Sequence, residues 1–431
     1  MKYLKLLVIL FIPFIFSGCY DKSELDNLAY VIGIGADVDE GENLKITYQI
    51  AIPVKIAGEN SETGKDTFTT YTVSAPSLYV GNSIVNALTS KEVNLSHIKL
   101  IIYSEELARS DLAGHINSLI SNASIRPKTS VAICKGTAED FFKNVAPVLE
   151  SSPARYYDLI LSSFNYTSES IGSELIEFYT SAQSIDKEAA VVIAKIINDP
   201  TEENLTSEGG QNNSGKEQNG NKKDDVSGGD AESQGTSELQ FAGSESNNQK
   251  SEAKFAGIAA FRGSKMVGEI SPELTMGHLI LSNGLREGTI TVPDIETPDK
   301  LASITLRQNK GCSFDVNIEG NVPKIKIKVF LDAHFQSSGA TTNYLENENK
   351  HKLNESVEKA VIDIINGYLD KLIEFDSDIV GIGKQVRKKY LTWEDFENLN
   401  WKEIFKNSEF EVETDVSLNV SQIIFHRIPN S

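Results

Sequence analysis

Cysteine is scarce in this chain of 431 residues, which carries three: Cys19, Cys134 and Cys312. Exported domains that depend on disulfides for stability use many more. Cys134 lies in the apolar run 130–134, which has the pattern of a strand, so we expect free thiols at Cys134 and Cys312, with a bridge between them as the alternative. The sequence therefore predicts a fold that is held together by its apolar core.

Patterns typical of catalysis or metal binding are also missing from the sequence. The six histidines are scattered without the i, i+4 spacing of a helical zinc motif, and no Gly-x-Ser-x-Gly occurs for a nucleophile elbow. The acidic segments 37–41 and 376–378 fail the EF-hand spacing, because position twelve holds Tyr48 in the first and Arg387 in the second. The sequence thus predicts neither an enzyme nor a metal site, and no cofactor; a hairpin turn is expected at 37–41.

A glycine-rich segment, 381–384, resembles a phosphate loop in part. Asp378 stands where the first glycine of that motif belongs, and Gln385 replaces its Ser or Thr. Because a carboxylate there would repel phosphate, a turn between two helices is the better interpretation of this segment.

Positive charge is in deficit, since 41 Lys and Arg stand against 61 Asp and Glu and give a net charge of −20. This balance argues against nucleic acid as a partner and against attachment to a membrane through a basic face. Beyond the N-terminus the chain also has no apolar run of the length, about twenty residues, that a spanning helix needs. Attachment to a membrane would therefore have to come from lipid.

The first nineteen residues have the layout of a bacterial lipoprotein signal. Lys2 and Lys5 supply positive charge, 6–16 is apolar apart from one proline, and small residues at 17–18 lead to Cys19. We expect cleavage of residues 1–18 and acylation of Cys19, since two or three acyl chains hold a protein firmly on a membrane. The alternative is a secretory signal whose cysteine is incidental. Without the two signal lysines, 39 basic and 61 acidic residues give the mature chain a net charge of −22.

Residues 202–252 differ in composition from the rest of the chain. They are mostly Gly, Ser, Asn, Gln, Glu, Asp and Lys, which cannot bury enough apolar surface to offset the entropy cost of ordering. We expect this segment to be a disordered acidic and polar insert. The apolar runs 189–197 and 255–261 flank it and have the pattern of strands that pair as a hairpin, which favours a loop within a domain over an interdomain linker.

The alternation of strand and helix patterns predicts a mixed α/β (α+β) fold with three domains, each a mainly antiparallel or mixed sheet with helices. The last third contains the clearest elements. We expect separate strands at 301–306 and 312–318, a long amphipathic helix from 353 to 375, a short helix that begins at Thr392, and a terminal strand from 410 to 420. After the signal at 1–18, the predicted domains are 19–182, 183–294 with the insert, and 295–431.

Several blocks of sequence occur in a specific order along the chain. They are Gly18-Cys19-Tyr20-Asp21-Lys22-Ser23-Glu24-Leu25, then Val31-Ile32-Gly33-Ile34-Gly35-Ala36-Asp37, then 97–108, then 376–383, and finally Arg387-Lys388, Trp393, Trp401, Phe405 and the terminal strand. In this order they resemble the C-subunit lipoproteins of bacterial spore nutrient germinant receptors, the Ger(x)C family. The departures are Tyr20 in place of the usual tryptophan, Leu391 where proline is frequent, and a longer insert.

The resemblance implies a lipid-anchored subunit on the outer face of the spore inner membrane, a specialised cell membrane. Such a subunit acts with an integral membrane subunit and with a second subunit that has soluble and spanning parts, in a complex that senses nutrients and triggers germination. The resemblance also implies three mixed α/β domains and no catalytic residue. It is silent on the contribution of this subunit to the complex.

Two other functions compete with a receptor subunit that works by protein contact. A solute-binding lipoprotein of a transporter usually has two doubly wound lobes, whereas the middle and last regions here are rich in strand patterns. A cell-wall hydrolase needs a carboxylate pair or a metal site, and the sequence shows neither pattern. The receptor subunit is therefore the favoured hypothesis.

A basic cluster stands beside two tryptophans near the C-terminal end of this acidic chain. Arg and Trp are favoured at protein interfaces, so we predict that Arg387, Lys388 and Trp393 contact a partner. The alternative is that Trp393 and Trp401 fill the core between the short helix and the terminal strand.

Overall fold

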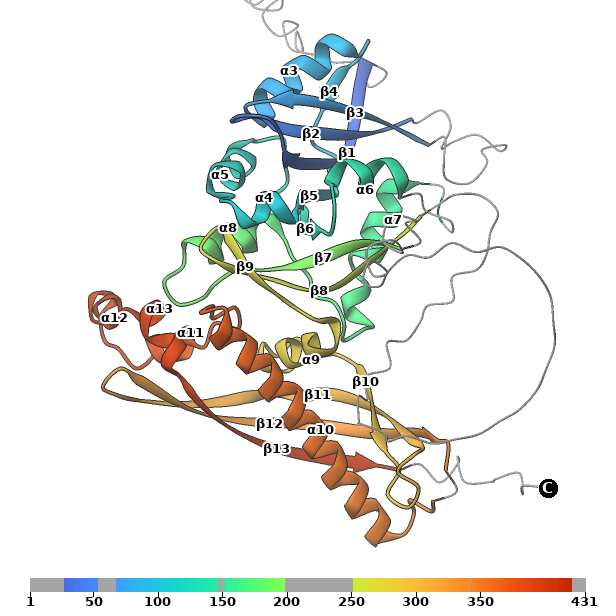
Figure 1. The fold of residues 1–431 in the computed structure, drawn as a ribbon, viewed down its shortest axis with the longest axis vertical. Coiled ribbons are helices and arrows are strands. Elements are labelled where there is room, and N and C mark those ends of the chain that lie inside the picture. Colours follow the sequence, from blue (N-terminus) through green and yellow to red (C-terminus); the bar gives the residue numbers. More distant parts are fainter. Residues whose placement is uncertain are drawn as a thin grey trace, which may run out of the picture.

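The computed structural model of the chain describes residues 27–52, 67–145, 150, 152–197, 251–340 and 342–420. Within them the chain forms two sheets, each covered by helices, that lie one above the other in Figure 1. The predicted lipoprotein signal and Cys19 lie outside the described residues, as does the predicted insert apart from Ser251 and Glu252.

The first sheet has nine strands in the order β3-β2-β1-β5-β6-β7-β8-β9, with β4 paired to β1. The central pairs β1–β5, β5–β6 and β6–β7 are parallel, and the outer pairs β1–β2, β2–β3, β7–β8 and β8–β9 are antiparallel. The strands are β1 (Leu28–Val38), β2 (Leu44–Ala51), β3 (Phe68–Ala75), β4 (Glu92–Asn94), β5 (Leu100–Ser104), β6 (Ser130–Cys134), β7 (Ala190–Ile197), β8 (Glu252–Arg262) and β9 (Lys265–Ile270).

Helices cover both faces of the first sheet. One face carries α3 (Leu78–Leu88), α4 (Glu105–Arg109), α5 (Ala113–Ser121) and α8 (Leu175–Gln183), whose apolar side chains share a core with the sheet. The other face carries α6 (Ala138–Asn144) and α7 (Pro153–Ile160), followed by the short 3-10 helix η2 (Ser163–Asn165). Both faces of the central strands are thus buried, which suits their continuous apolar sequences.

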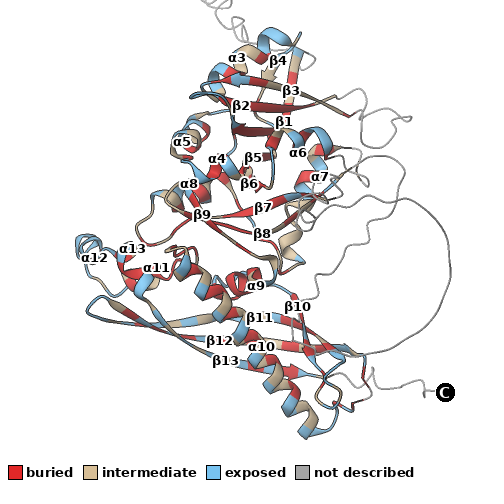
Figure 2. Cartoon of the chain, viewed as in Figure 1, coloured by how far each residue is buried: buried red, intermediate tan, exposed pale blue. Residues whose placement is uncertain are grey.

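The second sheet has four strands in the order β10 (Gly288–Pro293), β11 (Leu301–Glu319), β12 (Val322–Ser338) and β13 (Glu409–Asn419). Along β12 buried and exposed residues alternate, so one face packs on the core and the other meets solvent, as Figure 2 shows. The long helix α10 (Asn347–Glu374) lies along the sheet and packs against β13. Helix α9 (Pro272–Leu281) contacts both α10 and β8 and so joins the two sheets.

The structure confirms the predicted fold class, the long helix, the terminal strand and the hairpin that flanks the insert, where Ala190 pairs with Ala260. The prediction of two strands between 301 and 318 is wrong. The structure has one long strand, β11, whose pairing with β12 shifts register between Arg307 and Ser313, and these irregularities interrupt the apolar alternation.

The first sheet crosses the boundary predicted at 182/183. Strand β7 pairs in parallel with β6 through Ala132 and Val192, so β7, β8 and β9 extend the sheet that β1 to β6 begin. The division of the chain into three domains at this point stays a prediction.

Two predictions from composition can be compared with the described residues. Cys134 is buried and Cys312 is partly buried, and both are free thiols, as predicted. Burial raises the pKa of the Cys312 thiol to about 11 and raises that of Cys134 further. In the part of the chain that the structure describes, no helix combines the length and the apolar character needed to cross a membrane.

Candidate functional site

The segment 376–405 packs against the loop before β7 and the turn between β8 and β9. We call these three parts, residues 184–188, 262–264 and 376–405, the junction. The last part includes α11 (Gly383–Arg387), α12 (Trp393–Leu399), α13 (Trp401–Ile404) and the first residue of the 3-10 helix η3 (Phe405–Asn407). The junction holds the residues predicted to contact a partner, and it connects the two sheets at one side of the molecule (Figure 1).

Asp378 organises the centre of the junction. Its buried carboxylate accepts hydrogen bonds from the backbone N–H groups of Gly381, Ile382 and Gly383 at 2.8, 2.9 and 2.8 Å. The indole Nε1 of Trp401 donates a fourth bond at 2.9 Å. Burial raises the pKa of this carboxyl, and the four hydrogen bonds oppose that rise.

The same geometry explains why 381–384 looks like a phosphate loop in the sequence. Successive backbone N–H groups do converge on an anion, as they do in phosphate-binding nests. The anion is the side chain of Asp378, so the nest is filled from within the chain. The segment lies at the turn between two helices, α10 and α11, as predicted. Its N–H groups are not free to bind phosphate, because the Asp378 carboxylate accepts their hydrogen bonds.

Gly383 allows the close packing of this loop. A Cβ at this position would lie 2.6 Å from the carbonyl oxygen of Asp186 and 2.6 Å from the Trp401 ring, so a larger residue cannot fit without a shift. Trp401 is 2% exposed and packs on Phe405. For Trp401 the alternative interpretation as a core residue is therefore correct.

Two ion pairs connect the loop before β7 to the C-terminal part of the junction. Arg387 lies 2.6 Å from the buried carboxylate of Asp186, and Lys402 lies 2.7 Å from that of Glu188. Burial raises the pKa of Glu188, while Lys402 and the backbone N–H of Gly263 act in the opposite direction. Each pair joins the loop before β7 to the C-terminal segment, so breaking one would leave a buried charge without compensation.

The predicted contact residues differ in how they are placed. Arg387 is paired with Asp186, and its guanidinium also lies 5.3 Å from the centre of the Trp393 ring. Lys388 is exposed and donates to Gln385 at 2.7 Å. Trp393 is 52% exposed, in contrast to Trp401, and its Nε1 donates to Glu397 at 2.5 Å. The structure thus brings Arg387 and Trp393 together, and Lys388 is exposed.

Sequence reasoning missed Leu391, whose side chain is 100% exposed two residues before Trp393. We call Lys388, Leu391 and Trp393 the α12 surface. Leu391 and Trp393 are two of the exposed large apolar side chains among the described residues, and they lie two positions apart in the chain. No periodic signal in the sequence distinguishes Leu391 from a core leucine.

Asp37 has a role that the sequence analysis did not predict. It belongs to β1 rather than to a turn, and its buried carboxylate accepts from the N–H groups of Ala138 at 2.6 Å and Glu139 at 2.9 Å. It therefore binds the N-terminus of α6, where a negative charge is favoured. Burial raises the pKa of Asp37 in spite of these bonds.

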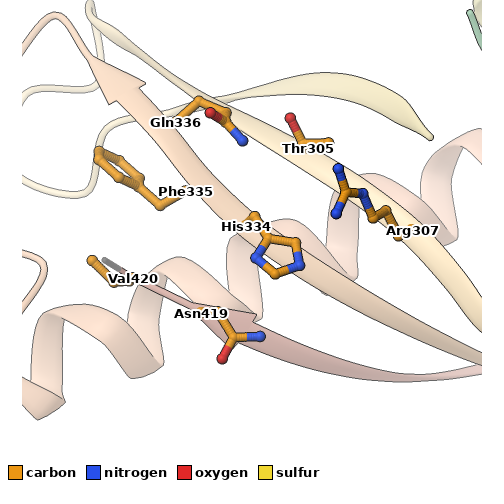
Figure 3. Close-up of a pocket in the computed structure, with 7 residues that line it drawn as sticks. All are labelled: Thr305, Arg307, His334, Phe335, Gln336, Asn419 and Val420. Carbon is orange, nitrogen blue, oxygen red and sulfur yellow. The ribbon is translucent and has the colours of Figure 1, made fainter. Parts of the chain in front are cut away.

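Figure 3 shows a polar hollow of about 350 Å³ on the outer face of the second sheet. Arg307 from β11, His334 from β12 and Asn419 from the end of β13 line it. The guanidinium of Arg307 is already held by Glu287 at 2.6 and 2.9 Å. Over the whole described part of the chain, no group of three or more His, Cys, Asp or Glu is placed to hold a metal ion.

Comparison with known proteins identifies the family. Residues 21–196 match the model of the spore germination protein N-terminal domain, and residues 256–421 match that of the spore germination B3/GerAC-like C-terminal region. The chain belongs to the spore germination GerAC-like family. Membership assigns it a role in spore germination, in agreement with the prediction.

Individual relatives of this GerAC-like chain are distant. It is 21% identical to "Putative spore germination protein YfkR" of Bacillus subtilis (strain 168) over 97% of each chain. It is 26% identical to Spore germination protein A3 of the same organism, over 36% of this chain and 42% of that protein. The crystal structure of the GerBC protein covers 92% of this chain and 99% of its own, with 16% identity and a TM-score of 0.49.

Proposed function

We propose that this chain is the lipid-anchored subunit of a spore germinant receptor and that it works by protein contact rather than by catalysis. Its anchor is a lipid on Cys19, and its place is the outer face of the spore inner membrane. Its partners are an integral membrane subunit and a subunit with soluble and spanning parts. The observation that carries the proposal is the match of both halves of the chain to spore germination families, together with the lipoprotein layout of residues 1–19.

The position of Cys19 limits the distance between the folded part and the membrane. Strand β1 begins at Leu28, nine residues after Cys19. A chain of nine residues spans at most about 32 Å when fully extended. A lipid on Cys19 would therefore keep the start of β1 within about 32 Å of the lipid surface, so the subunit would be held close to its membrane partners.

The α12 surface is our proposed contact with a partner subunit, and Arg387 supports it by positioning Trp393. Aromatic and basic residues are favoured at interface centres, and the exposed leucine adds apolar area that association would bury. Arg387 itself is a poor site for a charge reversal, because a glutamate there would face the buried carboxylate of Asp186. A test has to change Leu391 and Trp393 instead, since neither side chain is buried.

The double variant Leu391→Ser, Trp393→Ser tests the contact in spores. We expect recovery of the receptor subunits with the affinity-tagged chain to fall by about tenfold or more, since a central aromatic residue often contributes that much to binding. Germination in response to the nutrient of this receptor should slow in parallel. The thermal midpoint of the purified variant should stay within about 2 °C of the parent, because surface changes of this kind alter stability little.

The matched control is Leu88→Ser, which changes a 60% exposed leucine at the end of α3; in Figure 1 α3 lies at the top of the molecule, and α12 lies at the left, below the first sheet. This control should co-purify and germinate normally. If the double variant recovers the receptor subunits as well as Leu88→Ser does, the α12 surface is not a contact. If loss of the whole chain leaves the response to every nutrient unchanged, the receptor function itself is refuted.

A further inference from the structure

A cavity of about 240 Å³ lies on the face of the first sheet that α3 and α5 cover. Its floor comes from β1, β2 and β5, through apolar side chains such as Ile34, Ile46 and Ile101, all of them buried. The start of α3 and the exposed edge of α5 form the rim. This cavity is separate from the junction and from the α12 surface, because neither contributes a residue to it.

Tyr103 and His115 place polar groups on the lining of this largely apolar cavity. Tyr103 is 2% exposed, and its hydroxyl forms no hydrogen bond with any described residue; the imidazole of His115 likewise forms none. The two rings lie 6.4 Å apart between centroids, one from β5 and one from α5. Because the Tyr103 hydroxyl borders the open space of the cavity and has no hydrogen-bond partner among the described residues, it is available to bond a polar group of a ligand.

The lining also limits the charge of a ligand. No Asp, Glu, Lys or Arg is among the described residues that line the cavity. Burial lowers the pKa of His115, while Asp111 nearby acts in the opposite direction, so the imidazole is neutral near pH 7 and can accept or donate a hydrogen bond. A charged group placed on the apolar floor of the cavity would lose its hydration without gaining a counter-ion, which is strongly unfavourable.

The volume limits the size of a ligand. A water molecule in the liquid occupies about 30 Å³, so the cavity has room for about eight non-hydrogen atoms. That is less than a drug-sized pocket holds and suits a short aliphatic molecule.

We propose that this cavity is a binding site for a small uncharged amphiphile, with an aliphatic body of about six to eight heavy atoms and one hydroxyl or carbonyl group that bonds Tyr103 or His115. The apolar body would lie on the floor formed by β1, β2 and β5. The site goes beyond the proposed receptor function and does not depend on the lipid anchor or on the α12 surface.

Saturation-transfer NMR on the purified full chain tests the site, with 1-hexanol as the probe and hexanoate at pH 7 as its charged analogue. We expect transfer to 1-hexanol and none to hexanoate. Gly114→Leu should abolish the transfer, because a Cβ at Gly114 meets open space at the rim and a leucine there would occlude the cavity. Asn117→Leu is the control, since it adds the same side chain to the same helix away from the lining.

Tyr103→Phe tests the hydrogen bond without filling the cavity. Loss of one hydroxyl should weaken 1-hexanol binding by about fivefold, the usual effect of one neutral hydrogen bond. The proposal is overturned if the parent chain gives no transfer to 1-hexanol, if Gly114→Leu binds as well as Asn117→Leu, or if hexanoate binds as tightly as 1-hexanol. Because spores are not involved, failure here would leave the receptor function standing.

Discussion

Gly33 and Gly35 show how single residues set the spacing between layers. A Cβ at Gly33 would lie 2.3 Å from Cε1 of the buried Phe142, and a Cβ at Gly35 would lie 2.8 Å from the Cβ of Ala138. The absence of side chains at both positions lets α6 lie directly on β1, where Asp37 binds its N-terminus. The glycine alternation in this block of sequence thus has a packing explanation.

Gly33→Ala should therefore destabilise the protein. We expect a loss of about 1–3 kcal/mol in the free energy of unfolding, the usual cost of overpacking a closely packed core. Gly114→Ala is the matched control: its Cβ meets open space, and alanine favours a helix over glycine, so stability should hold or rise. Chemical denaturation of both variants measures the difference, and equal effects would show that α6 can move away from β1.

The stability of the fold should depend on pH through the buried His278. It is buried in α9, and its Nδ1 lies 2.7 Å from the Tyr368 hydroxyl in α10. Burial, with a contribution from Lys187, lowers its pKa from 6.5 to about 3. Below pH 6.5 the unfolded chain therefore binds a proton here that the folded chain does not, so stability is present above about pH 6.5 and is lost as the pH falls toward 3.

From this residue alone, the free energy of unfolding should fall by about 1 kcal/mol between about pH 7.5 and about pH 5.5. His278→Gln keeps a polar group near Tyr368 and does not titrate, so its decline over the same range should be smaller by that amount. Denaturation curves at the two pH values measure it. Identical declines in both proteins would mean that His278 is accessible to protons in the folded state.

The roles of individual residues are harder to predict from this sequence than its helices, its strands or its family. The spacing of residues 376–378 argues against an EF-hand, but it does not identify the four donors on Asp378, because Trp401 reaches Asp378 only after the chain folds back. It grouped Trp393 with Trp401, although the structure exposes the first and buries the second. Both failures have the same cause, since burial depends on neighbours that are distant in the sequence.

At the scale of elements, long periodic segments were predictable and irregular ones were not. Helix α10 keeps one apolar face through more than twenty residues, and this periodicity predicts it well. Strand β11 is continuous, but its central part is polar, so the sequence pattern predicts two separate strands there. The loop from 376 to 383 has no periodicity. Its shape comes from the buried Asp378 carboxylate, so removing that group should affect the whole element.

Asp378→Ala leaves three backbone N–H groups and one indole N–H without their acceptor. Each unsatisfied buried donor costs about 1–3 kcal/mol, so we expect a loss of at least about 3 kcal/mol in the free energy of unfolding. Asp370→Ala, which removes an exposed carboxylate from α10, should change stability by less than about 0.5 kcal/mol. Urea denaturation compares the two, and a loss below about 1 kcal/mol in Asp378→Ala would show that water replaces the carboxylate.

At the scale of the whole molecule, the composition of the chain and the order of the sequence blocks that resemble the germinant-receptor family predict the most. The family, the mixed α/β class and the hairpin that flanks the insert all followed from the sequence. The extension of the first sheet through β7 to β9 did not, because the parallel pairing of β6 with β7 joins strands more than fifty residues apart. The junction likewise depends on ion pairs such as Arg387–Asp186, which join residues about 200 positions apart.

Attachment through Cys19 is the central claim about the whole molecule, and a strain that carries Cys19→Ala tests it most directly. The measurement is the fraction of the chain in the spore membrane, with germination timed on several nutrients. We predict that the variant leaves the membrane fraction and that the response to one class of nutrient fails. A variant that stays in the membrane with normal germination would contradict the lipid-anchored receptor subunit.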